Sequence, residues 1–178
     1  ETIMLLELSK LLQRDGAEEE RQIDLEMTEL KLRRDRYRLL NKSPLALHLK
    51  NEGNRILRIE GKVDLTFEIP CARCLTPVSY SFSLEPERKA DMKLSAEERE
   101  KEADEVSFLD GEQLDPEQLV RNELLLHWPI RVLCDEACKG ICSHCGQNLN
   151  EAVCDCDRQE LDPRMAVISD IFRKHKEV

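Results

Sequence analysis

The segment over residues 134–156 constrains the fold of this chain more than any other stretch. It holds six of the chain's eight cysteines: Cys134, Cys138, Cys142, Cys145, Cys154 and Cys156. A segment so short and polar has little apolar material to bury, so disulfides or a metal must hold its loops together. The sequence Cys142-x-x-Cys145-Gly146 is typical of a zinc knuckle, because it sets two thiolates on a tight turn before a residue that tolerates a positive φ.

The chain is expected to lie in a reducing compartment, which favours zinc over disulfides. No segment of the sequence approaches the ~18 consecutive apolar residues of a membrane span, and the apolar string over residues 3–6 is too short for the core of a signal peptide. In a cytosolic protein, eight cysteines are not a disulfide framework. Spacing and compartment therefore both predict a metal site.

The other two cysteines, Cys71 and Cys74, lie between two runs of alternating apolar and polar residues. The apolar positions of these runs are Val63, Leu65, Phe67, Ile69, Tyr80, Phe82 and Leu84. The pattern predicts a β-hairpin with C-x-x-C at its tip, where both thiolates would point to one side. A redox pair is the rival interpretation, but such pairs lie where a strand runs into a helix, and no helical pattern follows Cys74.

Two groupings of the eight thiols remain open. In the first, one metal is bound by Cys142, Cys145, Cys154 and Cys156, and a second, joining the sheet to the tail, by Cys71, Cys74, Cys134 and Cys138. In the second, one metal is bound by Cys134, Cys138, Cys142 and Cys145, and the hairpin pair lies outside it. Either grouping predicts one or two structural Zn²⁺ ions, because four thiolates leave no ligand position open.

The remaining patterns predict an α+β fold. Alternation over roughly residues 20–85 predicts an antiparallel, partly closed β-sheet with the cysteine module and helices C-terminal to it. We expect a mainly antiparallel β domain over residues 1–85, an acidic linker over 86–105, and a helix, zinc-binding cysteine module and closing helix over 106–178. Asp115-Pro116 and Asp162-Pro163 predict the two helix starts, with Asp as N-cap and Pro at the first position.

One basic patch stands out in a chain with a formal net charge of −10. That charge works against non-specific attraction to nucleic acid or to an anionic membrane, so an RNA contact has to be local. The candidate RNA contacts are Lys31, Arg33, Arg34, Arg36, Tyr37, Arg38 and Lys139. The cations would neutralise phosphates and Tyr37 would stack on a base. The alternative is a solvated basic strand edge, which deters aggregation.

Several motifs together resemble a known family. They are C-A-R-C-L at residues 71–75, the pattern P-x-x-x-L-C-x-x-x-C-K-G-x-C-x-x-C-G-x-N-L-N over residues 129–150, C-x-C at 154–156 and D-P-R at 162–164. This combination is similar to the YceD family, the large ribosomal RNA subunit accumulation proteins. The resemblance implies a role in the synthesis, processing or stability of large-subunit (23S) rRNA, in bacteria and in plastids. We expect a location in the bacterial cytoplasm.

The sequence predicts a protein that is not an enzyme. It offers no paired carboxylates in an apolar setting, no phosphate-binding glycine loop and no nucleophile with a base. We expect a non-catalytic zinc-binding factor of large ribosomal subunit biogenesis. Its partner would be large-subunit rRNA or a pre-large-subunit particle, with no membrane and no small-molecule substrate. The alternative is an acidic adaptor or chaperone for a basic ribosomal protein, which would affect rRNA indirectly.

Overall fold

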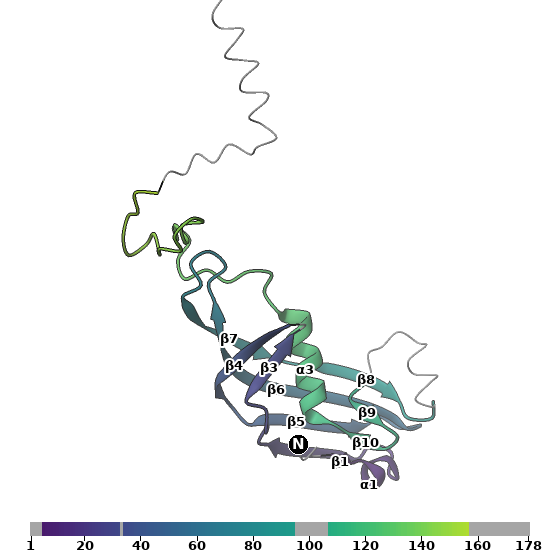
Figure 1. Ribbon diagram of the computed structural model, residues 1–178. Coiled ribbons are helices and arrows are strands. Elements are labelled where there is room, and N and C mark those ends of the chain that lie inside the picture. The colour runs from purple at the N-terminus through teal and green to yellow at the C-terminus, as the bar shows by residue number, and fades with distance from the viewer. Residues whose placement is uncertain (1–4, 33, 95–106, 157–178) are drawn as a thin grey trace, which may run out of the picture.

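The long central strand β6, Ile56–Pro70, organises the sheet in this computed structural model, which describes residues 5–32, 34–94 and 107–156 (Figure 1). Its first half pairs with β5, Leu45–Asn51, and with β8, Glu87–Asp91. Its second half pairs with β4, Asp35–Lys42, and with β7, Pro77–Leu84. All these pairings are antiparallel. One strand therefore connects the two ends of the sheet.

The other elements extend and cover this arrangement. β2, Glu18–Ile23, pairs with β5, and β3, Glu29–Leu32, pairs with β4. A smaller three-stranded sheet is formed by β1, Leu6–Glu7, β10, Gln113–Leu114, and β9, Leu109–Asp110. Two helices are described, the short α1, Ser9–Leu12, and α3, Pro116–His127. Neither described helix is long and apolar enough to cross a membrane. The antiparallel, partly closed sheet predicted from the sequence is confirmed.

A glycine within β6, Gly61, lies directly against the connection between β7 and β8. The Gly61 N–H donates to the Pro86 carbonyl at 2.8 Å, in the connection between β7 and β8. A Cβ at Gly61 would lie 2.9 Å from Pro86 Cγ and 3.3 Å from Leu47 Cδ2, so no larger residue fits between these neighbours. Gly61 thus lets the β7–β8 connection close over β6.

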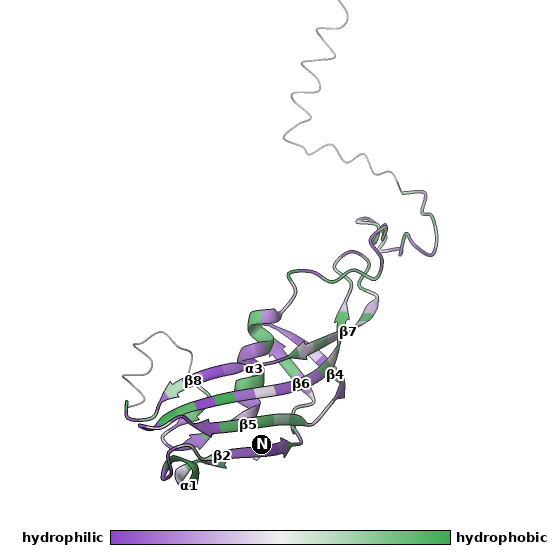
Figure 2. Ribbon diagram, turned by 180° about the vertical axis from the view of Figure 1, so that it is seen from behind, coloured by the Kyte–Doolittle hydropathy of each residue, from purple (hydrophilic) through white to green (hydrophobic). Residues whose placement is uncertain are grey.

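One aliphatic core lies between the sheet and α3. Alternate side chains of β5 and β6 are buried, as the period-2 pattern predicts, and Leu119, Val120 and Leu124 of α3 pack into the same cluster. The predicted start of α3 is confirmed: Asp115 is the N-cap, its carboxylate accepts the Gln118 N–H at 3.0 Å, and Pro116 is the first residue. Figure 2 shows hydrophilic and hydrophobic positions alternating along the strands.

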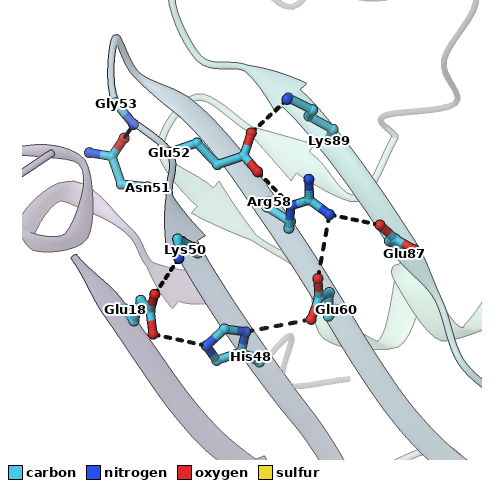
Figure 3. Close-up of polar contacts among 10 residues, drawn as sticks. All are labelled: Glu18, His48, Lys50, Asn51, Glu52, Gly53, Arg58, Glu60, Glu87 and Lys89. Atoms are coloured by element: carbon cyan, nitrogen blue, oxygen red, sulfur yellow. Dashed lines mark hydrogen bonds and ion pairs between the residues drawn. The ribbon is translucent and has the colours of Figure 1, made fainter. Parts of the chain in front are cut away.

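The solvent side of β2, β5, β6 and β8 carries a network of polar contacts between charged side chains and His48 (Figure 3). His48 lies 3.6 Å from Glu18 and 3.6 Å from Glu60. Arg58 reaches Glu52 at 2.6 Å and Glu87 at 2.9 Å. These contacts join neighbouring strands on the face that packs against no core, and each exposed pair contributes little to stability.

The acidic linker predicted over residues 86–105 is wrong at its beginning. Residues 87–91 form β8 and pair with Ile56–Glu60 of β6. This strand has a single buried apolar residue, Ala90, so it lacks the alternating apolar pattern that identifies a strand in the sequence. Arg88 also reaches Glu123 of α3 at 2.7 Å. Residues 95–106 and the predicted closing helix after Asp162-Pro163 lie outside the described residues.

Candidate metal centres

The eight cysteines lie in two groups of four, each with its sulfur atoms within 4.8 Å of one another. The sheet-linked cluster consists of Cys71, Cys74, Cys134 and Cys138, and the tail cluster consists of Cys142, Cys145, Cys154 and Cys156. Each could hold a metal ion. Of the two groupings that the sequence left open, the structure has the first. The second, with four cysteines of residues 134–145 around one metal, is not the observed arrangement.

The tip of the β6–β7 hairpin positions two thiols of the sheet-linked cluster. Pro70 and Pro77 are the last paired residues of the hairpin, and between them the Cys71 N–H donates to the Thr76 carbonyl at 2.9 Å. The Leu75 N–H donates back to the Cys71 carbonyl at 3.0 Å, with Leu75 at φ 62°. This tight turn directs both thiols to one side, so the predicted location of the C-x-x-C at a hairpin tip is confirmed.

The partner thiols arrive on the chain that follows α3. Cys74 Sγ lies 3.4 Å from Cys134 Sγ, and Cys71 Sγ lies 3.9 Å from Cys138 Sγ. In a tetrahedral zinc site with Zn–S bonds of about 2.3 Å, neighbouring sulfurs are about 3.8 Å apart. The two observed separations lie on either side of that value. The cluster therefore has the dimensions of a four-thiolate metal site.

Backbone contacts fix this chain against the hairpin. The Ala72 N–H donates to the Val132 carbonyl at 2.8 Å, and the Arg73 guanidinium donates to the Cys138 carbonyl, also at 2.8 Å. Gly140 has φ 82°, and a Cβ there would lie 3.1 Å from the Arg73 carbonyl oxygen. Glycine thus permits both the left-handed conformation and the close approach. Arg73 also places a positive charge beside the cluster.

The tail cluster is built on a local turn. The Gly146 N–H donates to the Cys142 carbonyl at 2.9 Å, and Gly146 has φ 74°, which confirms the positive φ expected after the second thiol of the knuckle. The Cys142 N–H donates to the Gln147 carbonyl at 2.8 Å. The short C-x-C pair at residues 154 and 156 then completes the group.

Asn150 links the two clusters, a role that sequence analysis did not identify. Its side-chain NH₂ donates to Cys138 Sγ at 3.3 Å, and its side-chain oxygen accepts the Lys139 N–H at 2.8 Å. Asn150 belongs to the tail loop, whereas Cys138 belongs to the sheet-linked cluster. The sequence N-L-N at residues 148–150 could have drawn attention to Asn150, but its spacing does not indicate which atoms the Asn150 side chain contacts.

Hydrogen bonds shift the pKa values of the thiols in opposite directions within each cluster. Burial raises the pKa of Cys71, but backbone N–H groups, that of Arg73 foremost, outweigh it and lower this pKa to about 6. Backbone hydrogen bonds, from Cys145 first, lower the pKa of Cys142 to about 6. Hydrogen bonding to Cys74 raises the pKa of Cys134 to about 12, and to Cys145 that of Cys156 to about 12. Each cluster thus pairs a readily ionised thiol with one that holds its proton, the usual state of a thiolate site before a cation displaces the protons.

The candidate RNA residues divide between two faces of the β3–β4 hairpin. Lys31 lies opposite Arg36, and Arg38 lies two residues further along the same face, opposite Glu29. Tyr37 lies on the other face, where its ring contacts Trp128 at a centroid distance of 4.8 Å. Arg34 is exposed in the turn, Lys139 is exposed in the cysteine module, and Arg33 lies outside the described residues. RNA contact by these residues stays a prediction.

Comparisons with known proteins agree on one family. The model of the family described as "Large ribosomal RNA subunit accumulation protein YceD" matches residues 59–172, more than half of the 178-residue chain. A protein of Arabidopsis thaliana, "Large ribosomal RNA subunit accumulation protein YCED homolog 1, chloroplastic", is 44% identical over 50 residues, which cover 28% of this chain and 16% of that protein. No solved structure matches the chain.

Proposed function

This chain belongs to the YceD family of large ribosomal RNA subunit accumulation proteins, and we propose that it is a non-catalytic, zinc-binding factor of large ribosomal subunit biogenesis. The family connects the chain to accumulation of large-subunit rRNA. We infer that it acts on the synthesis, processing or stability of 23S rRNA, in the bacterial cytoplasm. The observation that carries this inference is the family match over residues 59–172, a range that contains both cysteine clusters.

The donor set supports zinc as the metal. Four sulfur ligands within 4.8 Å of one another suit Zn²⁺ or an iron–sulfur centre. Each cluster combines one C-x-x-C turn with a second pair of cysteines, and four cysteine thiolates are a common ligand set of structural zinc sites. We infer one Zn²⁺ in each cluster. Because four thiolates would fill its coordination, each ion would hold loops in place and would not activate water. This is the basis for proposing a non-enzyme.

A direct contact with rRNA is supported by the cations of the β3–β4 hairpin. Lys31 is 56% exposed and Arg36 is 68% exposed, and they share one face of the hairpin with Arg38. Three neighbouring cations on one face can follow a phosphate backbone even when the protein as a whole is acidic. Glu29 lies 3.3 Å from Lys31 and 3.5 Å from Arg36, so RNA would have to displace these exposed pairs.

The alternative function, an acidic adaptor for a basic ribosomal protein, is favoured by the net charge of −10. The outer face of the sheet presents Glu18, Glu52, Glu60 and Glu87 (Figure 3). A basic partner could exchange its own cations for the lysines and arginines that now pair with these carboxylates. In that case the effect on rRNA would be indirect.

Ultraviolet crosslinking of the tagged protein in living cells, followed by sequencing of the bound RNA, separates the two functions. Direct contact predicts discrete fragments of large-subunit precursor rRNA, with recovery reduced at least fivefold in the double variant Arg36→Ser/Arg38→Ser. The matched control is Lys10→Ser/Arg14→Ser, which removes the same charge from exposed positions outside the hairpin. Direct contact is ruled out if no rRNA is recovered and a ribosomal protein copurifies instead.

A further inference from the structure

A groove of about 640 Å³ lies between the β3–β4 hairpin and the chain that leaves α3. Its apolar lining includes Leu32, Tyr37, Ile69, Leu125, Trp128 and Ile130. The groove ends at Ala72, next to the sheet-linked cluster, but no cysteine lines it. It is thus separate from both candidate metal centres.

Two aliphatic side chains at the groove face solvent. Ile130 is 104% exposed and Leu125 is 53% exposed. A single exposed aliphatic residue is ordinary on a protein surface, but here two of them continue an apolar groove of the size that accepts a few side chains. This combination indicates a surface that another molecule covers.

The aromatic residues of the groove do not offer a free stacking platform. Trp128 stacks on Phe82 at a centroid distance of 5.3 Å and an interplanar angle of 16°, and it also contacts Tyr37 at 4.8 Å and Phe67 at 5.7 Å. Binding of single-stranded RNA relies on ring faces that are open to bases. Because these contacts engage the Trp128 ring inside the protein, aliphatic side chains fit the groove better than nucleobases do.

Cations lie at the edges of the groove. Arg131 is exposed, and within the described part of the chain its side chain makes no hydrogen bond or ion pair. Lys31 lines the opposite side, and its one ion pair with a described residue is with the half-buried Glu29, at 3.3 Å. Among the described residues that line the groove, Asp35 is the one with an acidic side chain. A positive edge around an apolar floor is complementary to aliphatic side chains flanked by carboxylates.

We propose that this groove binds a short segment of a partner protein in which aliphatic side chains are flanked by Asp or Glu. An aliphatic side chain inserts beside Trp128 and Ile130, and the carboxylates pair with Arg131 and Lys31. The groove shares Lys31 and Tyr37 with the candidate RNA contacts. Its test therefore uses Ile130 and Arg131, which are not RNA candidates.

The test is selection of a displayed library of random 12-residue peptides on the full, zinc-loaded chain. We expect enriched peptides to combine aliphatic residues with Asp or Glu, and a synthetic copy to change the fluorescence of Trp128, the chain's one tryptophan. Ile130→Asp and Arg131→Glu should each weaken that peptide at least tenfold. The matched control is Leu126→Asp, because Leu126 is 61% exposed near the end of α3, close in sequence to Ile130, but does not line the groove.

Several results would overturn this assignment. They are selection of no peptide, selection of basic peptides, and equal loss of binding in the Leu126→Asp control. A 12-nucleotide single-stranded RNA that displaces the peptide and changes Trp128 fluorescence would reassign the groove to RNA. Because Ile130 and Arg131 are exposed, their variants should fold, and circular dichroism of each variant verifies this. The crosslinking experiment on Arg36 and Arg38 tests the RNA contact and does not involve Ile130 or Arg131. The RNA-contact proposal and the groove proposal can therefore fail independently.

Discussion

Each of the two cysteine clusters offers four thiol ligands, but the clusters are assembled in different ways. In the sheet-linked cluster, Cys74 and Cys134 are 60 residues apart in the chain, and Cys71 and Cys138 are 67 apart. The tail cluster is drawn entirely from residues 142–156. Exposure differs as well: three thiols of the sheet-linked cluster are buried, whereas Cys142 is the one buried thiol of the tail cluster.

The difference shows that a group of four cysteines can either join distant segments of the chain or order a single local loop. A metal that joins distant segments removes the conformational freedom of a long loop, and the free energy it contributes to folding grows with loop length. A metal held by a local turn orders mainly that turn. We therefore expect the sheet-linked metal to couple the tail to the sheet, and the tail metal to shape its own loop.

The largest effect is expected from Cys138→Ser. This change removes one ligand of the sheet-linked cluster and the sulfur that accepts a hydrogen bond from Asn150, so both clusters are disturbed. Zinc content should fall from two ions to one or fewer, with a loss of about 3 kcal/mol or more in the free energy of unfolding. Elemental analysis and denaturant titration measure the two quantities. Retention of both ions would contradict the ligand assignment.

A smaller effect is expected from Cys145→Ser. The variant should lose one zinc ion and the order of its tail loop, while amides of β5 and β6 keep their protection from hydrogen exchange, because the core contains no residue of the tail cluster. The control is Ser143→Ala, an exposed neighbour in the same turn. If the protection of β6 fell as far as it does in Cys138→Ser, the contrast between the clusters would be lost.

The pH dependence of zinc binding gives a third comparison. At pH 7, Cys134 and Cys156, with pKa values of about 12, are protonated, whereas Cys71 and Cys142, with pKa values of about 6, are mostly ionised. Zinc binding should therefore release at least one proton per cluster. The affinity for zinc should fall more steeply below pH 6, where one further thiol in each cluster must be deprotonated. Calorimetry in buffers of different ionisation enthalpy measures the release. A count of zero protons at pH 7 would contradict these thiol states.

The smallest effect is expected from a pair of glycine substitutions. Gly140→Ala strains a φ of 82° and brings a Cβ to 3.1 Å from the Arg73 carbonyl, whereas Gly146→Ala strains a φ of 74° in open space. Both should cost about 1 kcal/mol from the backbone, with an additional cost at Gly140 from the contact. Thermal unfolding of the two zinc-loaded variants measures the difference. Equal losses of stability in the two variants would show that the close approach of the Arg73 carbonyl to Gly140 does not constrain the contact between the hairpin tip and the chain after α3.

Local features of both regions were predictable from the sequence, and long-range ones were not. The turn at Cys142, Cys145 and Gly146 depends on neighbouring residues, and the hairpin that presents Cys71 and Cys74 depends on alternation, so each was predicted correctly. The grouping of the thiols could not be chosen, because Cys134 and Cys138 have acceptable spacing to either pair. Only the meeting of the hairpin with the chain after α3 decides between them.

Two features that the sequence did not reveal have the same cause. β8 is nearly devoid of apolar residues, so its place beside β6 is set by the partner strand and not by its own sequence. Tyr37 lies among arginines in the chain, yet the β3–β4 register turns it away from them and toward Trp128, which is distant in sequence. In both cases a residue's surroundings come from a partner strand or helix that no local pattern reveals.

The length of strand β6 sets the distance between the two ends of the sheet. Its 15 residues, at ~3.3 Å each, give a length of at most about 50 Å between the end flanked by the glutamate network and the tip that carries Cys71 and Cys74. A molecule held at one end and another held at the other would be kept apart by a continuous strand, not by a linker. Inserting or deleting residues within β6 would change that spacing and reverse which side chains face inward.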